Sequence, residues 1–332
     1  MKTTLQTALA NFPRQEKEGD LLLQKRVRER AASFPLTAGQ KERVKAELSV
    51  IEKTGTAAVF LEFSDTMSAL KELGGFCGGL ANSSYLCYFL GLTRVDPMRY
   101  GLYFERFFSE ERNRLPYFTL FVGCGNRERA MEYFNERYGF ERVASVKGTE
   151  EVLLSAKPLG FFTDTDVALK MDGERVWKER NVSMRDERTA RLGLCAFSLR
   201  EGEPTEELFS EKEIELWVKH NYQRHFDFDG AYSALGLTKA EELLKGLNGE
   251  FLFQEQFYSL CEALLGVSAT VADGWRLSLC KRNQREAAKI EGYFLSKLGE
   301  AGRELFHYIY NRLPYTVCKA YVVGEMLLKN IK

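Results

Sequence analysis

This sequence of 332 residues has no surplus charge of either sign, because 47 lysine and arginine residues balance 47 aspartate and glutamate residues. Proteins that bind duplex DNA without sequence preference are usually basic, since their cations release the counterions of the phosphates they neutralise. The neutral balance therefore argues against DNA binding by the surface as a whole and restricts any such contact to a local patch.

Paired cysteines and long apolar runs are also missing. The seven cysteines include no C-x-x-C pair, which indicates buried, reduced thiols and excludes a disulfide framework or a zinc site of that kind. The first thirty residues hold no apolar signal core, and no apolar run reaches the length of a membrane helix. We expect a cytoplasmic protein without membrane contact.

Residues that usually carry enzyme chemistry are sparse. The three histidines, His220, His225 and His307, are too widely spaced to predict a metal site, and no Ser-His-Asp or Cys-His arrangement is recognisable. We therefore expect neither a metal nor another cofactor.

The composition is typical of a folded protein with an apolar core. Apolar residues make up 45% of the chain and charged residues 28%, and 332 residues suffice for two packed domains. Residues 1–35 are polar and highly charged, which predicts an N-terminal arm. Thr37 and Gln40 fit a capping box, and Val44, Leu48 and Ile51 form the apolar stripe of the helix that follows.

The pattern of apolar residues then changes along the chain. Residues 57–63 and 117–122 are rich in strand formers, and residues 130–138 have helical spacing. After residue 204 the periodic runs are mostly helical, at 207–218, 238–247, 252–266, 285–298 and 303–310. We predict an α+β protein with a mixed α/β domain over 36–203 and a helical domain over 204–332.

One ordered set of motifs points to a family. Asp96-Pro97 is followed by the run Leu-Tyr-Phe-Glu-Arg-Phe at 102–107, by Glu-Glu-Arg at 110–112, and by Leu-Pro-Tyr-Phe-Thr-Leu-Phe at 115–121. This order resembles the palm of the bacterial DNA polymerase III alpha subunit, a family C DNA polymerase. The resemblance implies a nucleotidyltransferase-like palm followed by helical fingers.

The same resemblance implies that the catalytic metal site is lost. In the family, alternating aspartates on the strand at 117–121 and a third aspartate on a later strand hold two magnesium ions, which need anionic oxygen ligands. The corresponding residues here are Tyr117, Thr119, Phe121 and Ser198. None of them is an anionic ligand at neutral pH.

Other family features are altered as well. The resemblance leaves Gly75, Gly78 and Gly79 as a remnant of the loop that cradles the triphosphate, in which Gly78 and Leu80 stand where the family has its arginine and serine. Only four residues separate Val146 from Glu151, where the family inserts its thumb, so we expect the thumb to be absent. The fingers resemblance covers residues 253–256, 272–276 with 281–282, and 311–314.

These departures favour a catalytically inactive polymerase relative that acts as a binding or regulatory module in DNA replication or repair. A replication or repair protein is the expected partner, and DNA is a second. The resemblance places DNA contacts on a basic set in the fingers: Arg276, Lys281, Arg282, Arg285, Lys289 and Arg312. Trp275 and Tyr293 could stack on bases, although such charge runs are usually solvated helix faces.

A third alternative is an active nucleotidyltransferase whose carboxylates have moved. Asp164 with Asp166, and Asp227 with Asp229, have the spacing that places two side chains on one face of a strand. Gly230 after the second pair favours an acidic turn instead. Magnesium-dependent nucleotide incorporation would distinguish this alternative.

Overall fold

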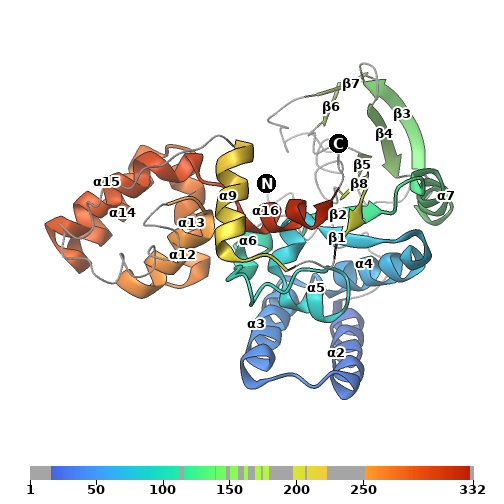
Figure 1. The fold of residues 1–332 in the computed structure, drawn as a ribbon, viewed down its shortest axis with the longest axis horizontal. Coiled ribbons are helices and arrows are strands. Elements are labelled where there is room, and N and C mark those ends of the chain that lie inside the picture. The colour runs from blue at the N-terminus through green and yellow to red at the C-terminus, as the bar shows by residue number, and fades with distance from the viewer. Residues whose placement is uncertain are drawn as a thin grey trace. The chain divides into compact units, whose positions relative to one another are not determined.

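The computed structural model describes residues 16–111, 116–138, 140–146, 150–155, 161–163, 169–172, 175–178, 197–205, 208–222 and 251–329 (Figure 1). The chain divides into two compact units. The first, which we call the sheet unit, comprises residues 1–97, 107–205 and 328–332, and the second, the helical unit, comprises residues 98–106 and 206–327. The predicted mixture of helices and strands is confirmed. The division differs from the predicted boundaries, because residues 98–106 join the helical unit and residues 328–332 join the sheet unit.

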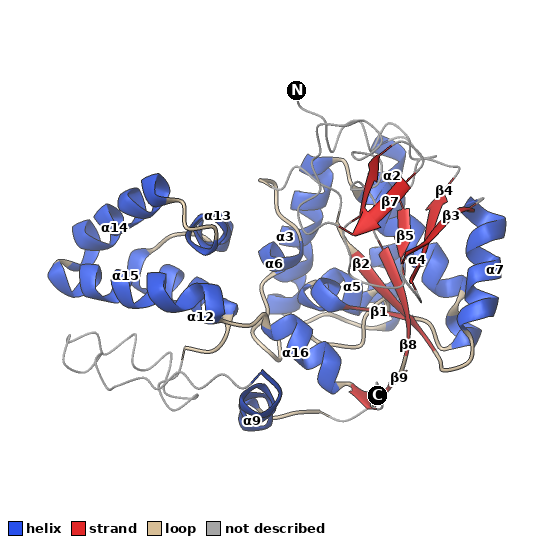
Figure 2. Ribbon diagram, turned by 90° about the horizontal axis from the view of Figure 1, so that it is seen from above, coloured by secondary structure: helices blue, strands red, loops and turns tan. Residues whose placement is uncertain are grey.

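In its described residues, the sheet unit contains five longer helices and one central sheet (Figure 2). The helices are α2 (Glu16–Ser33), α3 (Ala38–Thr54), α4 (Ala57–Ala69), α5 (Tyr85–Phe89) and α7 (Arg127–Tyr138), with 3₁₀ turns at Lys71–Leu73 and Gly79–Ser83. A short helix, α6 (Phe104–Phe107), lies at the boundary between the units. Among the described residues, no helix has the length and apolar character that a membrane crossing requires.

The predicted helix after residue 37 is confirmed as α3. Thr37 accepts a hydrogen bond from the backbone of Gln40, whose side chain accepts one from the backbone of Thr37. Val44 and Ile51 are buried, and the helix ends at Gly55, where φ of 66° suits a residue without a Cβ atom. The predicted capping box is thus present at the N-terminal end of α3, and Gly55 ends the helix.

The described part of residues 1–35 is a packed helix and not a separate arm. Leu23 and Val27 of α2 are buried, and α2 packs against α4. Gly19 permits this contact, because a Cβ atom there would lie 3.2 Å from the backbone nitrogen of Ala58. The high charge of the segment reflects the exposed side of the helix.

The strand predicted over residues 57–63 is wrong, because these residues form the first half of α4. Every side chain from Ala57 to Phe63 is buried, so the run shows no polar face from which a helical period could be recognised. Phe60 packs edge-on against Phe118, with ring centroids 5.7 Å apart. Continuous apolar runs of this length do not distinguish a buried strand from a buried helix.

The central sheet has six strands in the order β1-β2-β8-β5-β4-β3. The strands are β1 (Phe76–Gly78), β2 (Phe118–Val122), β3 (Phe140–Val146), β4 (Glu150–Ser155), β5 (Phe161–Thr163) and β8 (Phe197–Glu201). β2 runs antiparallel to β1 and parallel to β8. Two smaller pairs join β6 (Leu169–Asp172) to β7 (Arg175–Lys178) and β9 (Glu203–Pro204) to β10 (Leu328–Lys329). The strand predicted at 117–122 is confirmed as β2.

The helical unit is built from α9 (Glu211–Tyr222), α12 (Gln254–Leu260), α13 (Ala269–Cys280), α14 (Gln284–Leu298), α15 (Glu300–Arg312) and α16 (Lys319–Met326). A π-helical turn at Cys261–Leu265 continues α12. Large side chains from α12, α14 and α15 fill its core, among them Phe257, Phe294 and Phe306. The predicted helical runs at 252–266, 285–298 and 303–310 are confirmed, whereas 238–247 lies outside the described residues.

The prediction of buried thiols holds for most of the described cysteines. Cys77, Cys87, Cys261 and Cys318 are buried, and burial raises the pKa of the Cys318 thiol to about 12. Such thiols are unreactive because they remain protonated at neutral pH. Cys124 is exposed, so the prediction is wrong at that position.

Candidate functional site

Strand β2 carries the positions that the family resemblance assigns to the catalytic carboxylates, and its two faces have different surroundings. Phe118 points to the helical side, where its ring stacks on Phe63 at a centroid distance of 3.8 Å. Thr119 and Phe121 have the opposite parity and therefore lie on the other face. Both are buried.

An apolar cluster fills this second face beside Phe121. Phe121 is the register partner of Phe76 on β1, and their rings stack in parallel with centroids 5.0 Å apart. Leu328, which begins β10, completes the cluster, and the three side chains are 5–7% exposed. We call Phe76, Phe121 and Leu328 the apolar plug.

Two glycines make room for the plug. A Cβ atom at Gly78 would lie 2.7 Å from Cε2 of Phe121, and one at Gly202 would lie 2.9 Å from Cδ2 of Leu328. Real Cβ atoms do not approach other atoms so closely. Gly78, which the resemblance assigned to the triphosphate loop, therefore serves to accommodate the ring of Phe121.

The strands that carry the altered carboxylate positions are direct neighbours. Thr119 of β2 and Ser198 of β8 are register partners in a parallel pair. Tyr117 precedes β2 and is half-buried. The structure thus brings positions 119, 121 and 198 together, and their residue types supply no carboxylate for a divalent cation. Across the described residues, no three histidine, cysteine, aspartate or glutamate side chains gather as a metal site.

The glycine loop between Gly74 and Gly79 uses its backbone amides within the protein. The amide of Gly75 donates to the carbonyl of Leu70 at 2.9 Å, and that of Cys77 donates to the carbonyl of Leu92 at 2.7 Å. Gly78 and Gly79 are buried and Gly75 is half-buried. These two amides are consequently not directed at a bound anion.

Sequence reasoning missed a buried carboxylate behind this loop. Glu47 of α3 is 1% exposed, and its oxygens accept hydrogen bonds from Ser84 Oγ at 2.7 Å and from the amides of Tyr85 and Leu86 at 2.8 and 2.9 Å. Arg43 donates to it from Nε at 2.7 Å. Glu47 therefore binds the N-terminal end of α5 and holds that helix against α3. Its spacing from Val44 and Ile51, on the buried stripe, was the available signal.

We expect Glu47→Ala to lower the free energy of unfolding by about 3–5 kcal/mol, because it removes the carboxylate that pairs with Nε of Arg43 and accepts hydrogen bonds from Ser84 Oγ and two buried amides. Urea unfolding followed by circular dichroism measures this change. Glu42→Ala on the exposed side of the same helix is the matched control and should change stability by less than about 0.5 kcal/mol. Equal effects of the two substitutions would contradict the role assigned to Glu47.

In the helical unit, most of the predicted basic set is accessible. Lys281, Arg282, Arg285 and Lys289 are exposed, while Arg312 is half-buried. Arg282 donates to the carbonyl of Tyr310 at 2.8 Å, and Lys289 donates to Glu286 at 2.7 Å. The guanidinium carbon of Arg312 lies 3.9 Å from the ring centroid of Tyr308. The exposed members lie at the end of α13 and along α14.

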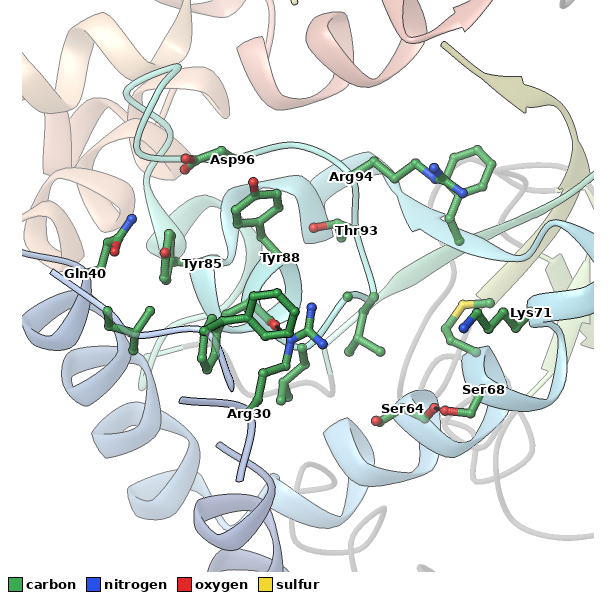
Figure 3. Close-up of a pocket in the computed structure, with 18 of the residues that line it drawn as sticks. Arg30, Gln40, Ser64, Ser68, Lys71, Tyr85, Tyr88, Thr93, Arg94 and Asp96 are labelled. Atoms are coloured by element: carbon green, nitrogen blue, oxygen red, sulfur yellow. Dashed lines mark hydrogen bonds between the residues drawn. The ribbon is translucent and has the colours of Figure 1, made fainter. Parts of the chain in front are cut away.

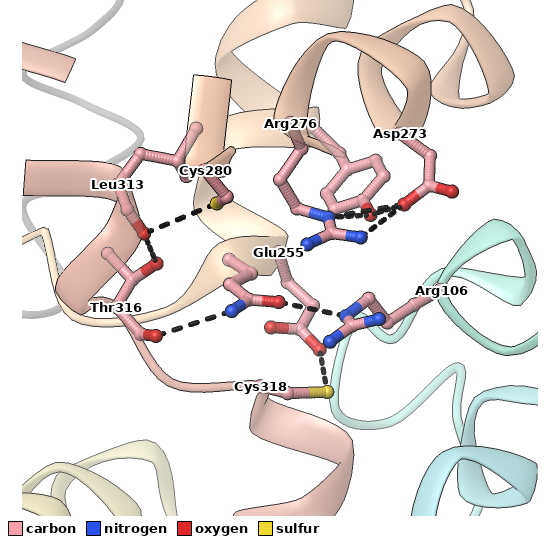
Figure 4. Close-up of polar contacts among 10 residues, drawn as sticks. Arg106, Glu255, Asp273, Arg276, Cys280, Leu313, Thr316 and Cys318 are labelled. Carbon is pink, nitrogen blue, oxygen red and sulfur yellow. Dashed lines mark hydrogen bonds and ion pairs between the residues drawn. The ribbon is translucent and has the colours of Figure 1, made fainter. Parts of the chain in front are cut away.

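Arg276 does not belong to this exposed surface. It is 4% exposed and donates from Nη2 to Asp273 at 2.9 Å and from Nε to the hydroxyl of Tyr258 at 3.0 Å (Figure 4). The Tyr258 hydroxyl donates to Asp273 at 2.6 Å, and burial raises the pKa of Tyr258, which keeps this proton in place. Arg276 is spaced four residues from Ala272 and three from Leu279, on the buried stripe of α13. That spacing could have corrected the prediction.

The aromatic residues considered for base stacking pack within the helical unit. The ring of Trp275 meets that of Tyr293 at a centroid distance of 5.3 Å and that of Phe294 at 6.3 Å. Trp275 and Tyr293 are both half-buried. Their principal contacts are with each other and with the core.

The motif at 253–256 has a structural role in the same unit. Glu255 is buried and accepts hydrogen bonds from the amides of Lys319 at 2.9 Å and Ala320 at 3.4 Å, at the start of α16. Gln256 accepts from the amides of Leu252 and Phe253 at 2.8 and 2.7 Å. Sequence reasoning treated the motif only as a family marker.

Four carboxylates considered for a relocated metal site lie outside the described residues, together with one histidine: Asp164, Asp166, Asp227, Asp229 and His225.

Comparison with known proteins supports the resemblance for part of the chain. Residues 20–156 match the family model described as the bacterial DNA polymerase III alpha NTPase domain. An error-prone DNA polymerase of Bordetella parapertussis is 35% identical over 144 residues, which are 42% of this chain and 13% of that protein.

Two DNA polymerase III alpha subunits match shorter stretches. The subunit of Yersinia pestis is 37% identical over 108 residues, 32% of this chain and 9% of that protein. The subunit of Thermus aquaticus is 38% identical over 103 residues, 30% of this chain and 8% of that protein. The matched stretch thus spans only about an eighth or less of these relatives. Residues 20–156, which include most of α2, the glycine loop and strand β2, are thus similar to the bacterial DNA polymerase III alpha NTPase domain, and the chain contains stretches similar to error-prone DNA polymerases and DNA polymerase III alpha subunits.

Proposed function

We propose that this protein is a catalytically inactive relative of the DNA polymerase III alpha subunits and acts as a binding module in DNA replication or repair. In this proposal the sheet unit corresponds to a polymerase palm and the helical unit to polymerase fingers. The observation that carries the proposal is the apolar plug at Phe121, on the face of β2 where the family's metal-binding carboxylates would lie.

The plug supports inactivity because its chemistry is the opposite of a magnesium site. Magnesium requires oxygen ligands and keeps part of its water shell, whereas Phe76, Phe121 and Leu328 exclude water and offer no oxygen from their side chains. Gly78 and Gly202 fit the plug closely. The residues around the altered position therefore form a coherent apolar core.

A protein partner is favoured over DNA as the main ligand by the net charge of zero. A surface that tracks a phosphate backbone needs an excess of cations. The opposing observation is the exposed basic group of Lys281, Arg285 and Lys289 in the helical unit, and it makes DNA the second candidate.

Primer extension tests the catalytic part of the proposal. With a labelled primer–template, all four deoxynucleotides and either magnesium or manganese, the purified chain should incorporate no nucleotide. An active polymerase on the same substrate is the positive control. Incorporation that requires a divalent cation and is abolished by Asp164→Asn with Asp166→Asn, or by Asp227→Asn with Asp229→Asn, would establish the relocated nucleotidyltransferase instead.

The DNA alternative predicts salt-dependent binding through the exposed basic group. The triple variant Lys281→Ala, Arg285→Ala and Lys289→Ala should bind single-stranded or primer–template DNA at least tenfold more weakly. If each cation contacts one phosphate, the slope of log affinity against log salt should also become less steep by about 2–3. Fluorescence anisotropy at low and physiological salt measures both quantities. Lys212→Ala, an exposed lysine on α9, is the matched control. Identical titrations of the triple variant and the wild type would exclude this surface.

A further inference from the structure

A pocket of about 820 Å³ opens in the sheet unit (Figure 3). Its walls come from the link between α2 and α3, the C-terminal half of α4, and the segment from α5 to Asp96, together with Gly75 and Phe76 of the glycine loop. The amide of Gly75 donates to the carbonyl of Leu70, so it is not directed at an anion in the pocket. This wall therefore differs from a loop that cradles a phosphate.

Apolar side chains form a large part of the lining. Met67, Phe89 and Leu92 line the pocket from the core, and each is at most 6% exposed. Residues 34–36 continue this apolar lining to the surface, where the side chain of Phe34 is 56% exposed. A large aromatic side chain left exposed beside an apolar pocket is typical of a surface that a partner covers.

Three exposed cations, Arg30, Lys71 and Arg94, also line this pocket. Within the described part of the chain, none of the three forms an ion pair. One carboxylate, Asp96, lines the pocket, but it already has an interaction partner, and Figure 3 shows it across the pocket from Lys71 and Arg94. The pocket thus combines an apolar lining with cations whose charge is not balanced locally.

Aromatic rings hold the two arginines in place. The guanidinium carbon of Arg30 lies 4.6 Å from the ring centroid of Phe34, and Arg30 donates from Nε to the carbonyl of Phe89. The guanidinium carbon of Arg94 lies 5.6 Å from the ring centroid of Phe76. Arginines fixed in this way keep further donors for a carboxylate and lose little freedom on binding it.

A buried hydroxyl in the same wall lacks a partner. Thr93 is 4% exposed, and its Oγ1 makes no hydrogen bond among the described residues. Figure 3 shows Thr93 between Tyr88 and Arg94. Buried polar groups are nearly always satisfied, and an exception is explained by water or by a ligand.

We propose that this pocket docks a short acidic segment of a partner protein, with one apolar side chain of that segment packed against Phe34, Phe89 and Leu92. Acidic side chains on either side of this anchor pair with the three cations, which is how arginine clusters recognise acidic motifs. The hydroxyl of Thr93 donates to the bound segment. The inference deepens the proposed function, because it rests on the protein partner proposed there and locates its docking site.

An acidic segment suits these observations better than a nucleic acid does. The phosphates of a nucleic acid would satisfy the cations, but they leave the apolar lining unfilled. A protein with a net charge of zero also has no excess of cations beyond the pocket to follow a phosphate backbone. A segment that carries both an apolar anchor and carboxylates matches both features of the pocket.

Fluorescence anisotropy of the full chain with labelled peptides tests the proposal. The peptides carry a Leu, Phe or Trp anchor with Asp and Glu residues on both sides, as in Asp-Glu-Leu-Phe-Glu-Asp. At least one of them should bind, and its affinity should fall as the salt concentration rises. The same peptide with Gly in place of the anchor, or with Lys in place of the acidic residues, should bind at least tenfold more weakly.

Variants of the pocket locate the binding surface. Arg94→Glu and Lys71→Glu should each weaken the acidic peptide at least tenfold, and so should Ser68→Trp, which places a large side chain at an exposed lining position of α4. Thr93→Val should weaken it severalfold without lowering the melting temperature. Arg28→Glu makes the same charge change on the exposed side of α2, outside the pocket, and should bind as the wild type does. Circular dichroism verifies that each variant keeps its fold.

Several results would overturn the proposal. They are the absence of binding by every acidic peptide, equal affinity for the peptide without the anchor, and binding that Arg94→Glu and Lys71→Glu leave unchanged. Displacement of the peptide by single-stranded DNA or tripolyphosphate at equal concentration would show a general anion site instead. Primer extension separates this inference from the proposed function: a chain that neither binds the peptides nor incorporates nucleotide remains an inactive polymerase relative, but not one that docks a partner here.

Discussion

Phe121→Asp is expected to destabilise the protein by at least about 4 kcal/mol at pH 7, because it removes a buried aromatic ring and places a carboxylate among apolar groups. The ring of Phe121 stacks on Phe76 at 5.0 Å and closes over Gly78. The new carboxylate would have the apolar side chains of Phe76 and Leu328 as neighbours. Thermal and urea unfolding of the purified variant measure the loss.

The cause can be separated into lost packing and buried charge. Phe121→Leu keeps an apolar side chain and should cost only about 1–2 kcal/mol. The additional loss in Phe121→Asp should shrink as the pH falls toward about 4. Burial raises the pKa of the introduced carboxyl in the folded state above its value in the unfolded chain. The folded protein therefore takes up a proton first as the pH falls, and the loss that is due to the charge disappears once the unfolded chain is protonated as well.

Magnesium decides what this result means for function. If the plug has replaced the metal site, millimolar magnesium should leave the stability of Phe121→Asp unchanged. A rise in melting temperature with magnesium, seen in Phe121→Asp but not in Phe121→Leu, would show that a cation still binds at this face. That outcome would contradict the interpretation of the plug as a permanent replacement.

The sequence predicted those parts of the fold that depend on local signals. The capping box at Thr37, the strand-forming residues at 117–122 and the spacing of the helices after residue 250 all indicated the observed elements. The strand prediction for residues 57–63 was wrong because these residues are buried on every side. Their burial removes the contrast between apolar and polar positions that distinguishes a helix from a strand.

The candidate site was predictable by residue type but not by arrangement. Positions 117, 119, 121 and 198 were recognised as lacking carboxylates, yet only tertiary pairing shows that β2 and β8 are neighbours. The contribution of Leu328 to the plug was not visible, since it follows Phe121 by more than two hundred residues and reaches it through the β9–β10 pair. Glu47 was missed because a charged residue on an apolar stripe gives no indication of the partner that it meets.

Arg276→Ala is expected to lower the free energy of unfolding by about 3–5 kcal/mol, because it leaves the buried Asp273 without its cation. Tyr258 can still donate a hydrogen bond to Asp273, but a neutral donor does not replace the cation that balances this buried charge. Arg285→Ala on the exposed side of α14 removes the same charge and should change stability by less than about 0.5 kcal/mol. Denaturant unfolding of the two variants gives the comparison.

This pair of variants also determines how DNA-binding experiments on the helical unit are interpreted. A variant that includes Arg276→Ala would lose DNA affinity through partial unfolding, even if Arg276 never contacts a phosphate. Arg276→Ala together with Asp273→Leu should recover part of the stability, since removing both partners leaves no unpaired buried charge. A different result would contradict this interpretation: Arg276→Ala keeps full stability and lowers DNA affinity tenfold, while the triple variant at Lys281, Arg285 and Lys289 has no effect. Arg276 would then contact DNA, and its burial in the network with Tyr258 would not describe the bound protein.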